Sequence, residues 1–316
     1  MTTDAGHPYQ GRIEVLAKTA FGIVFTEAGN ETTVLKGMSV WLDGVEFDRR
    51  PAVIPGVLER EATIYKALGD HPRITKCYGL EFIPTTAAAA GPGPFVPNGG
   101  GSPLNHSLAL RLERAPLGSL RQLIVETPAY EKPSVAFRLA VALDFAEGVC
   151  RLHERKVLWA DLSTRNALVF DGYRVKLCDF GGAFLDGTRY APVRAYETRY
   201  EPPRRHAGRY GGHGGGGGGG FQAPMLAGEI FALGSAIYEI TEWEVPYGPA
   251  VSERDVAVKL SRGELPVLSE DNPARAVIRR CWSAYTSAQR VPGWNGTALA
   301  YEAWCALKQV AEQHGP

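Results

Sequence analysis

The stretch VLWADLSTRNALVFDGYRVKLCDFGG, residues 157–182, decides the fold. Its apolar runs VLW and ALVF are typical of short strands, and Asp171-Gly172 suits the positive φ angles of a type I′ hairpin. Polar side chains stand where these strands end. Asp161 and Asn166 bracket a tight loop, and Asp179 follows the second hairpin strand. This spacing can bring three oxygen-bearing side chains to one point.

Carboxylate and amide oxygens are suitable ligands for Mg²⁺, which keeps phosphate oxygens and water in its remaining positions. Phosphoryl transfer uses such a cation together with a further carboxylate that receives the hydroxyl proton. Each of the three residues alone could instead cap a turn, as Asp and Asn often do. All three at this spacing favour a phosphate site.

Outward from this stretch, the periodicity predicts a sheet-rich front and a helix-rich back, with the change near residue 115. Residues 11–37 hold short apolar pieces divided by a Gly-Asn turn, which predicts a small antiparallel sheet. Residues 58–68 predict an amphipathic helix with one apolar face, made of Leu58, Ala62, Tyr65 and Leu68. Residues 133–154 and 228–243 predict longer helices, and the second is apolar nearly all round, as a buried helix would be.

Two segments lack any apolar period. Residues 85–107 and 208–221 are rich in Gly, Pro and Ala, a composition typical of flexible insertions. The second segment contains a run of glycines, but it has no strand-to-helix context that would form an ordered phosphate cradle. We therefore expect both segments to be surface loops.

Charge and cysteine content exclude several classes of protein. Lys plus Arg and Asp plus Glu each number 34, so no overall field attracts nucleic acid or an anionic membrane. No apolar stretch approaches the roughly 20 residues needed to span a bilayer, and the first residues resemble neither a secretory signal nor a transit peptide. Five widely spaced cysteines without CxxC pairs indicate reduced core thiols. An intracellular, cytoplasmic location is expected.

The opening stretch resembles the catalytic loop and D-F-G segment of the eukaryotic protein kinase family, whose pattern is H-R-D-L-x-x-x-N followed by D-F-G. TVLK, residues 33–36, resembles the family's V-A-I-K strand, and EATIY, residues 61–65, resembles the helix that follows it. The resemblance extends over about residues 12–310. It implies an α+β, bilobal fold with a β-rich N-lobe over residues 12–115 and a mainly helical C-lobe over residues 116–311.

The resemblance also implies the roles of the main site residues. Asp161 would orient the substrate hydroxyl and accept its proton, while Asn166 and Asp179 would bind Mg²⁺. Lys36 would hold the α- and β-phosphates of ATP, and Glu61 would pair with it. An ammonium group that faces phosphates needs such a counter-carboxylate to hold its rotamer. Alternatively, Lys36 could be an exposed lysine of a strand, and Glu61 could be an ordinary surface carboxylate of a helix.

LALRLERA, residues 108–115, is predicted as a strand and resembles the segment that joins the kinase lobes, with Leu112 as gatekeeper. Arg165 stands as in the D-L-A-A-R-N form of tyrosine kinases and could contact the transferred phosphate, or it could simply face solvent. The nucleotide-binding residues implied in addition are Gly22, Val24, Val34, Leu112, Glu113, Ala115 and Leu168.

Several positions depart from the kinase pattern. Of the three glycines in G-x-G-x-x-G only the third is present, because Ala17 and Thr19 precede Gly22. Side chains at the first two positions hinder close approach of the backbone to phosphate. Trp159-Ala160 replaces His-Arg, and the absent arginine removes the usual receptor for a phosphate on the activation segment.

Other departures affect the C-lobe and the adenine site. RYEPPRR replaces the A-P-E pattern, which places Arg204 where a glutamate is usual and opposite Arg290, unless Glu201 reaches across. Glu229 replaces the buried aspartate of the central helix, and Val34 replaces a smaller alanine.

The sequence thus predicts a protein kinase that transfers the γ-phosphate of Mg-ATP to a Ser, Thr or Tyr hydroxyl of a protein substrate. A pseudokinase that serves as a binding or scaffold module is the alternative, because the glycine-rich loop is degraded. A small-molecule phosphotransferase of kinase-like fold is a third possibility, disfavoured by the intact Asp-Phe-Gly. The oligomeric state stays open.

Overall fold

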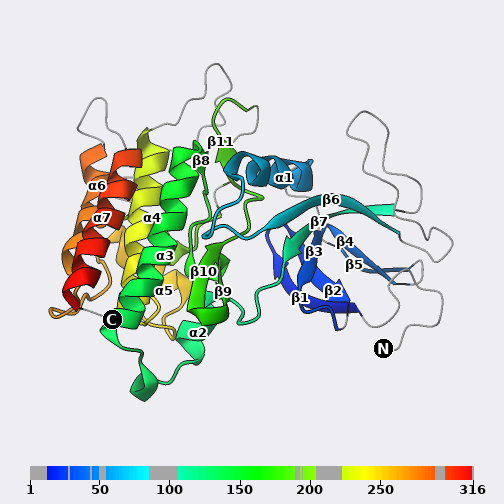
Figure 1. The fold of residues 1–316 in the computed structure, drawn as a ribbon. Helices are drawn as coiled ribbons and strands as arrows, with labels where there is room; N and C mark the ends of the chain where they lie inside the picture. Colours follow the sequence, from blue (N-terminus) through cyan, green and yellow to red (C-terminus); the bar gives the residue numbers. More distant parts are fainter. Residues whose placement is uncertain are drawn as a thin grey trace. The chain divides into compact units, whose positions relative to one another are not determined.

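The computed structural model describes residues 13–27, 29–42, 45–49, 55–84, 106–188, 193, 195–203, 223–288 and 296–314 (Figure 1). The chain forms two compact units. Unit 1 comprises Met1–Asp70, Thr75–Pro116 and Asp179–Gly182, and unit 2 comprises His71–Ile74, Leu117–Cys178 and Ala183–Pro316. Unit 1 is built on a sheet and unit 2 mainly on helices, which confirms the predicted α+β fold with a β-rich and a helical lobe.

Unit 1 contains an antiparallel sheet of five strands in the order β1-β2-β3-β7-β6. The strands are β1 (Ile13–Thr19), β2 (Gly22–Glu27), β3 (Thr33–Gly37), β6 (Cys77–Pro84) and β7 (His106–Glu113). A separate hairpin joins β4 (Ser39–Leu42) to β5 (Val45–Arg49). The sheet predicted for residues 11–37 is confirmed.

Successive side chains of β3 alternate between the two faces of the sheet, and this alternation determines which way Lys36 points. Leu35 packs in a buried cluster with Ile23 and Phe25. Successive side chains of a strand point to opposite faces, so Val34 and Lys36 lie on the face away from that cluster. The core of the sheet therefore leaves Lys36 free to meet other elements.

Strand β7 begins inside the region that we predicted as an insertion. His106 pairs with Pro84, and Ser107 pairs with Ile83, so both residues extend the β6–β7 ladder. The prediction of a loop was wrong for these two residues because cross-strand pairing outweighed the polar local composition. Residues 85–105 and the second predicted insertion, residues 208–221, lie outside the described residues.

Helix α1 (Val57–Leu68) covers the segment predicted as an amphipathic helix. Three of the four residues of the predicted face, Leu58, Tyr65 and Leu68, are buried, whereas Ala62 is half-buried. The helix also buries the polar residues Arg60 and Glu61. The hydrophobic period does not show these two residues, and both contribute to the site described below.

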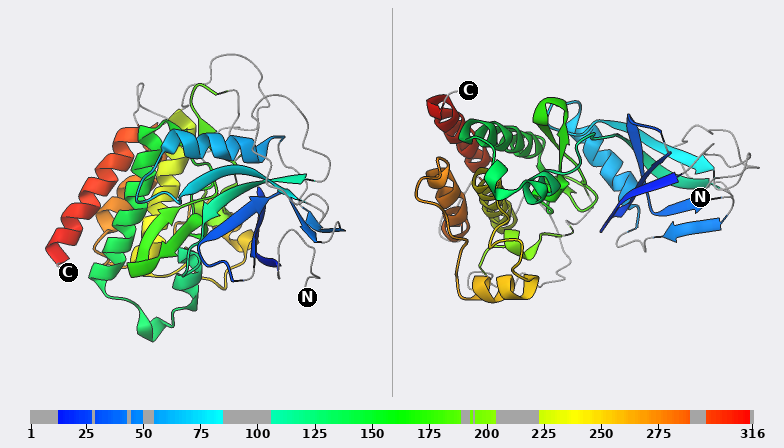
Figure 2. Two further views of the ribbon diagram at one scale, coloured as in Figure 1. Left: turned by 45° about the vertical axis from the view of Figure 1, so that its right-hand side comes forward. Right: turned by 90° about the horizontal axis from the view of Figure 1, so that it is seen from below.

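Unit 2 is organised around α3 (Val135–Glu154) and α4 (Ala223–Glu242), which pack against each other (Figure 2). Helix α7 (Gly296–His314) packs against α3, and α6 (Arg275–Ala288) packs against α4. The remaining helices are α2 (Leu120–Glu126) and α5 (Glu253–Ser261). Residues 229–243 of the chain are all buried, as the nearly uniform apolar composition predicted.

Two short strand pairs carry the central stretch of the sequence. β8 (Val157–Leu158) pairs with β11 (Phe184–Leu185), and β9 (Ala167–Phe170) pairs with β10 (Arg174–Leu177). The β9–β10 hairpin differs from the prediction of a two-residue type I′ turn at Asp171-Gly172. Phe170 pairs directly with Arg174, so the loop has three residues, and the positive φ angles fall at Gly172 (67°) and Tyr173 (56°).

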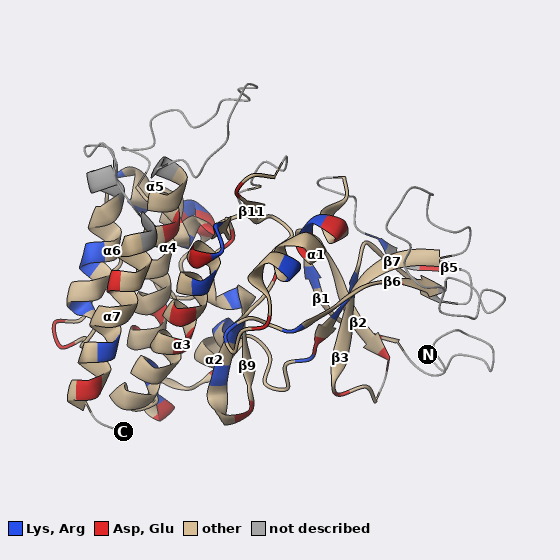
Figure 3. Cartoon of the chain, turned by 45° about the horizontal axis from the view of Figure 1, so that its top comes forward, with Lys and Arg blue, Asp and Glu red and all other residues tan. Residues whose placement is uncertain are grey.

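Charged side chains of both signs are interspersed along the helices (Figure 3), in line with the balanced composition. Within the described residues, no helix combines the length and apolar character needed to cross a bilayer. All five cysteines belong to the described part of the chain and none forms a disulfide. Cys150 and Cys281 are buried, whereas Cys77, Cys178 and Cys305 are half-buried.

Candidate active site

A lysine with two carboxylates forms the centre of the site in unit 1. Lys36 Nζ, on β3, lies 2.6 Å from Glu61 Oε2 of α1 and 2.7 Å from Asp179 Oδ1. The Lys36 side chain is only 2% exposed. The structure thus brings together three residues that the sequence placed on a strand, on a helix and after a hairpin.

Electrostatics keep the Lys36 ammonium charged in spite of its burial. Burial by itself lowers the pKa of Lys36, but Asp179 and Glu61 outweigh it and raise the pKa above its ordinary value. Burial raises the pKa of Glu61, and the ammonium of Lys36 opposes that increase. Removal of one partner would leave an uncompensated buried charge, which typically costs about 3–5 kcal/mol.

The Asp-Phe-Gly segment is anchored in unit 1 at successive points. The backbone N–H of Phe180 donates to Glu61 Oε1 at 3.1 Å, and Arg60 Nη2 donates to the carbonyl of Gly182 at 3.0 Å. The ring of Phe180 also meets the Tyr65 ring edge-on, with centroids 5.0 Å apart. The sequence did not predict the role of Arg60, because its partner is the backbone carbonyl of Gly182, which is far away in the sequence and leaves no side-chain pattern.

The turn between β1 and β2 lies close to this centre. Gly22 could not carry a side chain, because an added Cβ would lie 3.0 Å from the carbonyl of Gly37 and 3.3 Å from Lys36 Cγ. Thr19 uses its hydroxyl to accept the backbone N–H of Phe21 at 3.1 Å. In a loop with the full G-x-G-x-x-G pattern, backbone N–H groups of this turn are available to donate hydrogen bonds to phosphate. The replacement of glycine by Thr19 therefore engages a backbone N–H of the β1–β2 turn.

The residues predicted to contact adenine are distributed over both units. Val24 pairs with Lys36 across β2 and β3, and Val34 pairs with Leu112 across β3 and β7. Val34 and Leu112 are buried, while Ala115 is half-buried. The N–H of Glu113, in the segment that resembles the connection between kinase lobes, donates to the carbonyl of Lys76 at 3.0 Å. This N–H is therefore already engaged within unit 1. Leu168 lies on β9 of unit 2.

In unit 2, hydrogen bonds close the loop that carries Asp161 and Asn166. Asn166 Nδ2 donates to the carbonyl of Asp161 at 2.9 Å, and the N–H of Asn166 donates to the carbonyl of Ser163 at 3.1 Å. The N–H of Cys178 then donates to the carbonyl of Asn166 at 2.9 Å. Because its nitrogen is engaged, the Asn166 side chain is left with its oxygen to coordinate a cation.

Glu229 of α4 holds the backbone that leads into Asp161. Its carboxylate accepts hydrogen bonds from the N–H groups of Trp159 (3.1 Å) and Ala160 (3.0 Å). It also contacts His153 Nε2 at 2.9 Å and the Tyr196 hydroxyl at 3.1 Å. The carboxylate expected on the central helix therefore anchors the catalytic loop, whereas the contributions of His153 and Tyr196 were not predicted.

Two residues of the site have left-handed backbone conformations that are unusual for residues other than glycine. Ala160 has a φ of 64° and Asp179 has a φ of 56°. Such conformations cost roughly 1–3 kcal/mol and persist only where the surroundings determine them. Glu229 holds Ala160, and Lys36 holds the side chain of Asp179.

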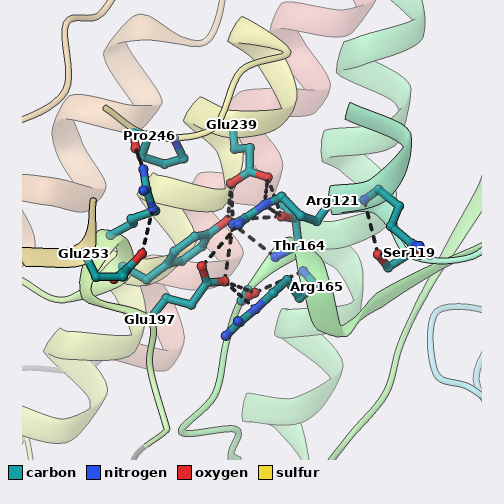
Figure 4. Close-up of polar contacts among 12 residues, drawn as sticks. Ser119, Arg121, Thr164, Arg165, Glu197, Glu239, Pro246 and Glu253 are labelled. Atoms are coloured by element: carbon teal, nitrogen blue, oxygen red, sulfur yellow. Dashed lines mark hydrogen bonds and ion pairs between the residues drawn. The ribbon is translucent and has the colours of Figure 1, made fainter. Parts of the chain in front are cut away.

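Arg165 is held by a partner that sequence reasoning missed. Its Nε lies 2.7 Å from Glu197 Oε1, and its side chain is 51% exposed. Glu197 belongs to a larger cluster with Arg121 and Glu239, which lie far apart in the sequence (Figure 4). Of the residues considered for the A-P-E region, Arg204 and Arg290 lie outside the described residues.

The described part of the chain contains no group of three or more His, Cys, Asp or Glu side chains that could hold a metal ion by itself. Mg²⁺ in nucleotide sites is usually held by one or two side chains together with phosphate oxygens and water. A carboxylate at Asp179 and an amide oxygen at Asn166 fit that mode in their donor chemistry.

Several curated proteins are similar to this chain. A probable LIM domain-containing serine/threonine-protein kinase of Dictyostelium discoideum is 24% identical over 231 residues, which are 71% of this chain and 20% of that protein. Serine/threonine/tyrosine-protein kinase HT1 of Arabidopsis thaliana is 29% identical over 178 residues, 52% of this chain and 40% of that protein. Retinal guanylyl cyclase 1 of Bos taurus is 25% identical over 265 residues, 78% of this chain and 21% of that protein.

The chain spans well under two thirds of the length of each of these relatives. Residues 12–190, more than half of the chain, match the family described as protein tyrosine and serine/threonine kinase. The fold and the order of the site residues agree with this match. The chain belongs to the protein tyrosine and serine/threonine kinase family.

Proposed function

We propose that this protein is an active kinase that transfers the γ-phosphate of Mg-ATP to a Ser, Thr or Tyr hydroxyl of a protein substrate. The observation that carries the proposal is the Lys36 ammonium held at 2.6 Å from Glu61 and 2.7 Å from Asp179. A buried lysine ordered by two carboxylates is the charge arrangement that a polyphosphate tail and its cation require.

Unit 1 supplies the groups that bind and neutralise phosphate. Lys36 would hold the α- and β-phosphates while Glu61 keeps its rotamer, and the Asp179 carboxylate would bind the cation. ATP supplies the phosphoryl group, and Mg²⁺ neutralises the charge that develops on it. Positioning and charge neutralisation account for most of such catalysis.

Unit 2 supplies the groups that act on the substrate hydroxyl. Asp161 would orient that hydroxyl and accept its proton, and the Asn166 oxygen would contribute to cation binding. Arg165, half-exposed and held by Glu197, would contact the transferred phosphate. The five cysteines, none of which forms a disulfide, support a reducing, cytoplasmic location for the reaction.

Nucleotide binding and transfer can be tested separately. Mg-ATP at about 100 times its dissociation constant should stabilise the wild type by about 2.7 kcal/mol in a melting experiment. Lys36→Met should abolish this stabilisation. Asp161→Asn should keep it but lose transfer of labelled phosphate to a protein substrate. The control is Asp171→Asn, because Asp171 is an exposed carboxylate of the β9–β10 loop.

A second candidate is a kinase-like binding module without activity. Two observations favour it: Thr19 occupies a backbone donor of the β1–β2 turn, and one similar protein is named a guanylyl cyclase rather than a kinase. A wild type that neither shifts its melting temperature with Mg-ATP nor transfers phosphate would establish this candidate in place of the proposed kinase activity.

A further inference from the structure

Arg121 is a nearly buried arginine that joins three parts of unit 2. It lies in the first turn of α2, whose N-terminus is closed by a capping box of Ser119 and Gln122. The Arg121 side chain is 14% exposed, and its guanidinium lies against two carboxylates, Glu239 and Glu197 (Figure 4).

Glu239, on α4, makes the deeper of the two contacts. Its side chain is fully buried. Arg121 donates to it through Nε, and also through Nη2 at 2.8 Å. The hydroxyls of Thr164 (2.5 Å) and Tyr200 (2.8 Å) donate to the same carboxylate. Burial raises the pKa of Glu239, and the guanidinium of Arg121 opposes that increase.

Glu197 makes the second contact, nearer the surface. Arg121 Nη1 and Nη2 lie 3.1 and 3.3 Å from its two oxygens, so the pair is bidentate. The same carboxylate accepts the Ser163 hydroxyl at 2.8 Å and lies 2.7 Å from Arg165 Nε. Arg121 therefore bridges two carboxylates that have further partners in the catalytic loop.

Residues 163–165 fill most of the loop between Asp161 and Asn166, and each of them bonds to Glu197 or Glu239. The Asn166 side chain then bonds back to the carbonyl of Asp161. The loop is thus held by side chains at every residue from 163 to 166. If the two carboxylates moved apart, the loop would lose its anchors, and Asp161 would move with it.

The geometry points to Arg121 as a positioning residue for phosphoryl transfer, which places Asp161 by holding Glu197 and Glu239 together. This inference rests on the proposed kinase activity and adds a residue that touches neither nucleotide nor substrate hydroxyl. The planar guanidinium is required, because its donors point in fixed directions and can bind each carboxylate through two hydrogen bonds, whereas an ammonium is a compact charge without this fork geometry.

The alternative is that Arg121 only stabilises the fold. A second arginine in unit 2 serves as a matched control for this alternative. Arg73 is 9% exposed and also binds two carboxylates, Asp144 at 2.8 Å and Glu147 at 2.7 Å. Among the described residues, its side chain makes no hydrogen bond or ion pair with the loop of residues 161–166. Arg73→Met and Arg121→Met should therefore destabilise the protein similarly but differ in their effect on catalysis.

The kinetic experiment compares the two variants well below their melting temperatures. Arg121→Met should lower kcat by about 10²-fold, the effect expected of a small misplacement of a catalytic group, with the KM for ATP unchanged. Millimolar guanidinium chloride should restore part of that kcat by occupying the vacated position. Arg73→Met should keep wild-type kcat and show no response to guanidinium. Equal kcat losses in both variants, or none in Arg121→Met, would overturn the inference.

Hydrogen exchange provides a readout that does not depend on activity. The backbone N–H of Asn166, bonded to the carbonyl of Ser163, should exchange faster in Arg121→Met than in Arg73→Met or the wild type. Equal exchange in all three proteins would contradict the positioning role. A wild type without phosphate transfer would contradict the proposed function alone, and the exchange rates would then still decide whether Arg121 holds the loop.

Discussion

Phe21 determines how much space is available beside the lysine centre. Its side chain is 1% exposed, and its Cβ lies 2.6 Å from the position that a methyl group on Gly181 would take. A Cβ added to Gly22, the next residue, would lie 3.3 Å from Lys36 Cγ. The ring therefore lies beside the segment that carries Asp179, and we expect a bound polyphosphate tail to displace it.

Phe21→Ala is expected to bind Mg-ATP several-fold more tightly than the wild type, because no ring then has to leave its buried position. The dissociation constant can be measured by titration calorimetry at a temperature where the variant is folded, since loss of a buried Phe costs roughly 3–5 kcal/mol. Phe21→Leu keeps an apolar side chain and should lie between the two. Weaker binding by Phe21→Ala would show instead that the ring contributes to the nucleotide site.

At the scale of elements, the contact between α4 and α6 depends on a glycine. A Cβ added to Gly234 of α4 would lie 2.7 Å from Cys281 Cβ and 3.0 Å from Trp282 Cδ1. Trp282 in turn donates its indole N–H to the Ser235 hydroxyl at 3.1 Å, which fixes the register of the two helices. Helix α4 carries Glu229 and Glu239, so its packing also determines where the catalytic loop is anchored.

Gly234→Ala is expected to destabilise the protein by about 1–3 kcal/mol, because the methyl group forces α4 and α6 apart. The matched control is Gly228→Ala on the same helix, where an added Cβ meets no atom within 4 Å. That change should stabilise by up to about 1 kcal/mol through helix propensity. Urea unfolding of both variants tests the pair, and equal effects would show that the α4–α6 contact can adjust.

At the scale of the whole molecule, unit 1 holds the half-buried thiol of Cys77, and unit 2 holds the buried thiols of Cys150 and Cys281. Burial raises the pKa of Cys77 in unit 1 to about 11, and the pKa values of Cys150 and Cys281 in unit 2 to about 12. An unfolded thiol titrates near 8.5. Above that pH the unfolded chain binds fewer protons than the folded one, so stability is present below about pH 8.5 and is lost as the pH rises toward 12.

Cys281→Ala is therefore expected to reduce the loss of stability between pH 8.5 and 10.5. One fully buried thiol contributes up to about 1.4 kcal/mol per pH unit in this range. The measurement is the free energy of unfolding in urea at several pH values. Val277→Ala, also buried on α6, removes apolar atoms but no titratable group and should keep the wild-type slope. If the free energy of unfolding of Cys281→Ala falls with pH as steeply as that of the wild type, the Cys281 thiol is not responsible for the loss of stability.

Local patterns predicted much of this protein because they act over a few residues. The uniform apolar composition of residues 228–243 predicted a buried helix, and the alternation along residues 33–37 predicted a strand. The chain order of Lys36, Glu61 and Asp179 predicted their roles through a family pattern. The turn of the β9–β10 hairpin was predicted wrongly, because the pairing of Phe170 with Arg174 decides its length.

The sequence by itself determined the lobes, the main helices and strands, and the residues of the lysine centre, since these follow from periodicity and from motifs that lie within short stretches. Only the tertiary structure decided which polar side chains outside the lysine centre became partners. Arg121, Glu197 and Glu239 carry no local signal, because charged residues of a solvated surface look the same in a sequence. They meet because α2, α4 and the turn that begins after Glu197 pack together, and burial then makes each charge depend on the other two.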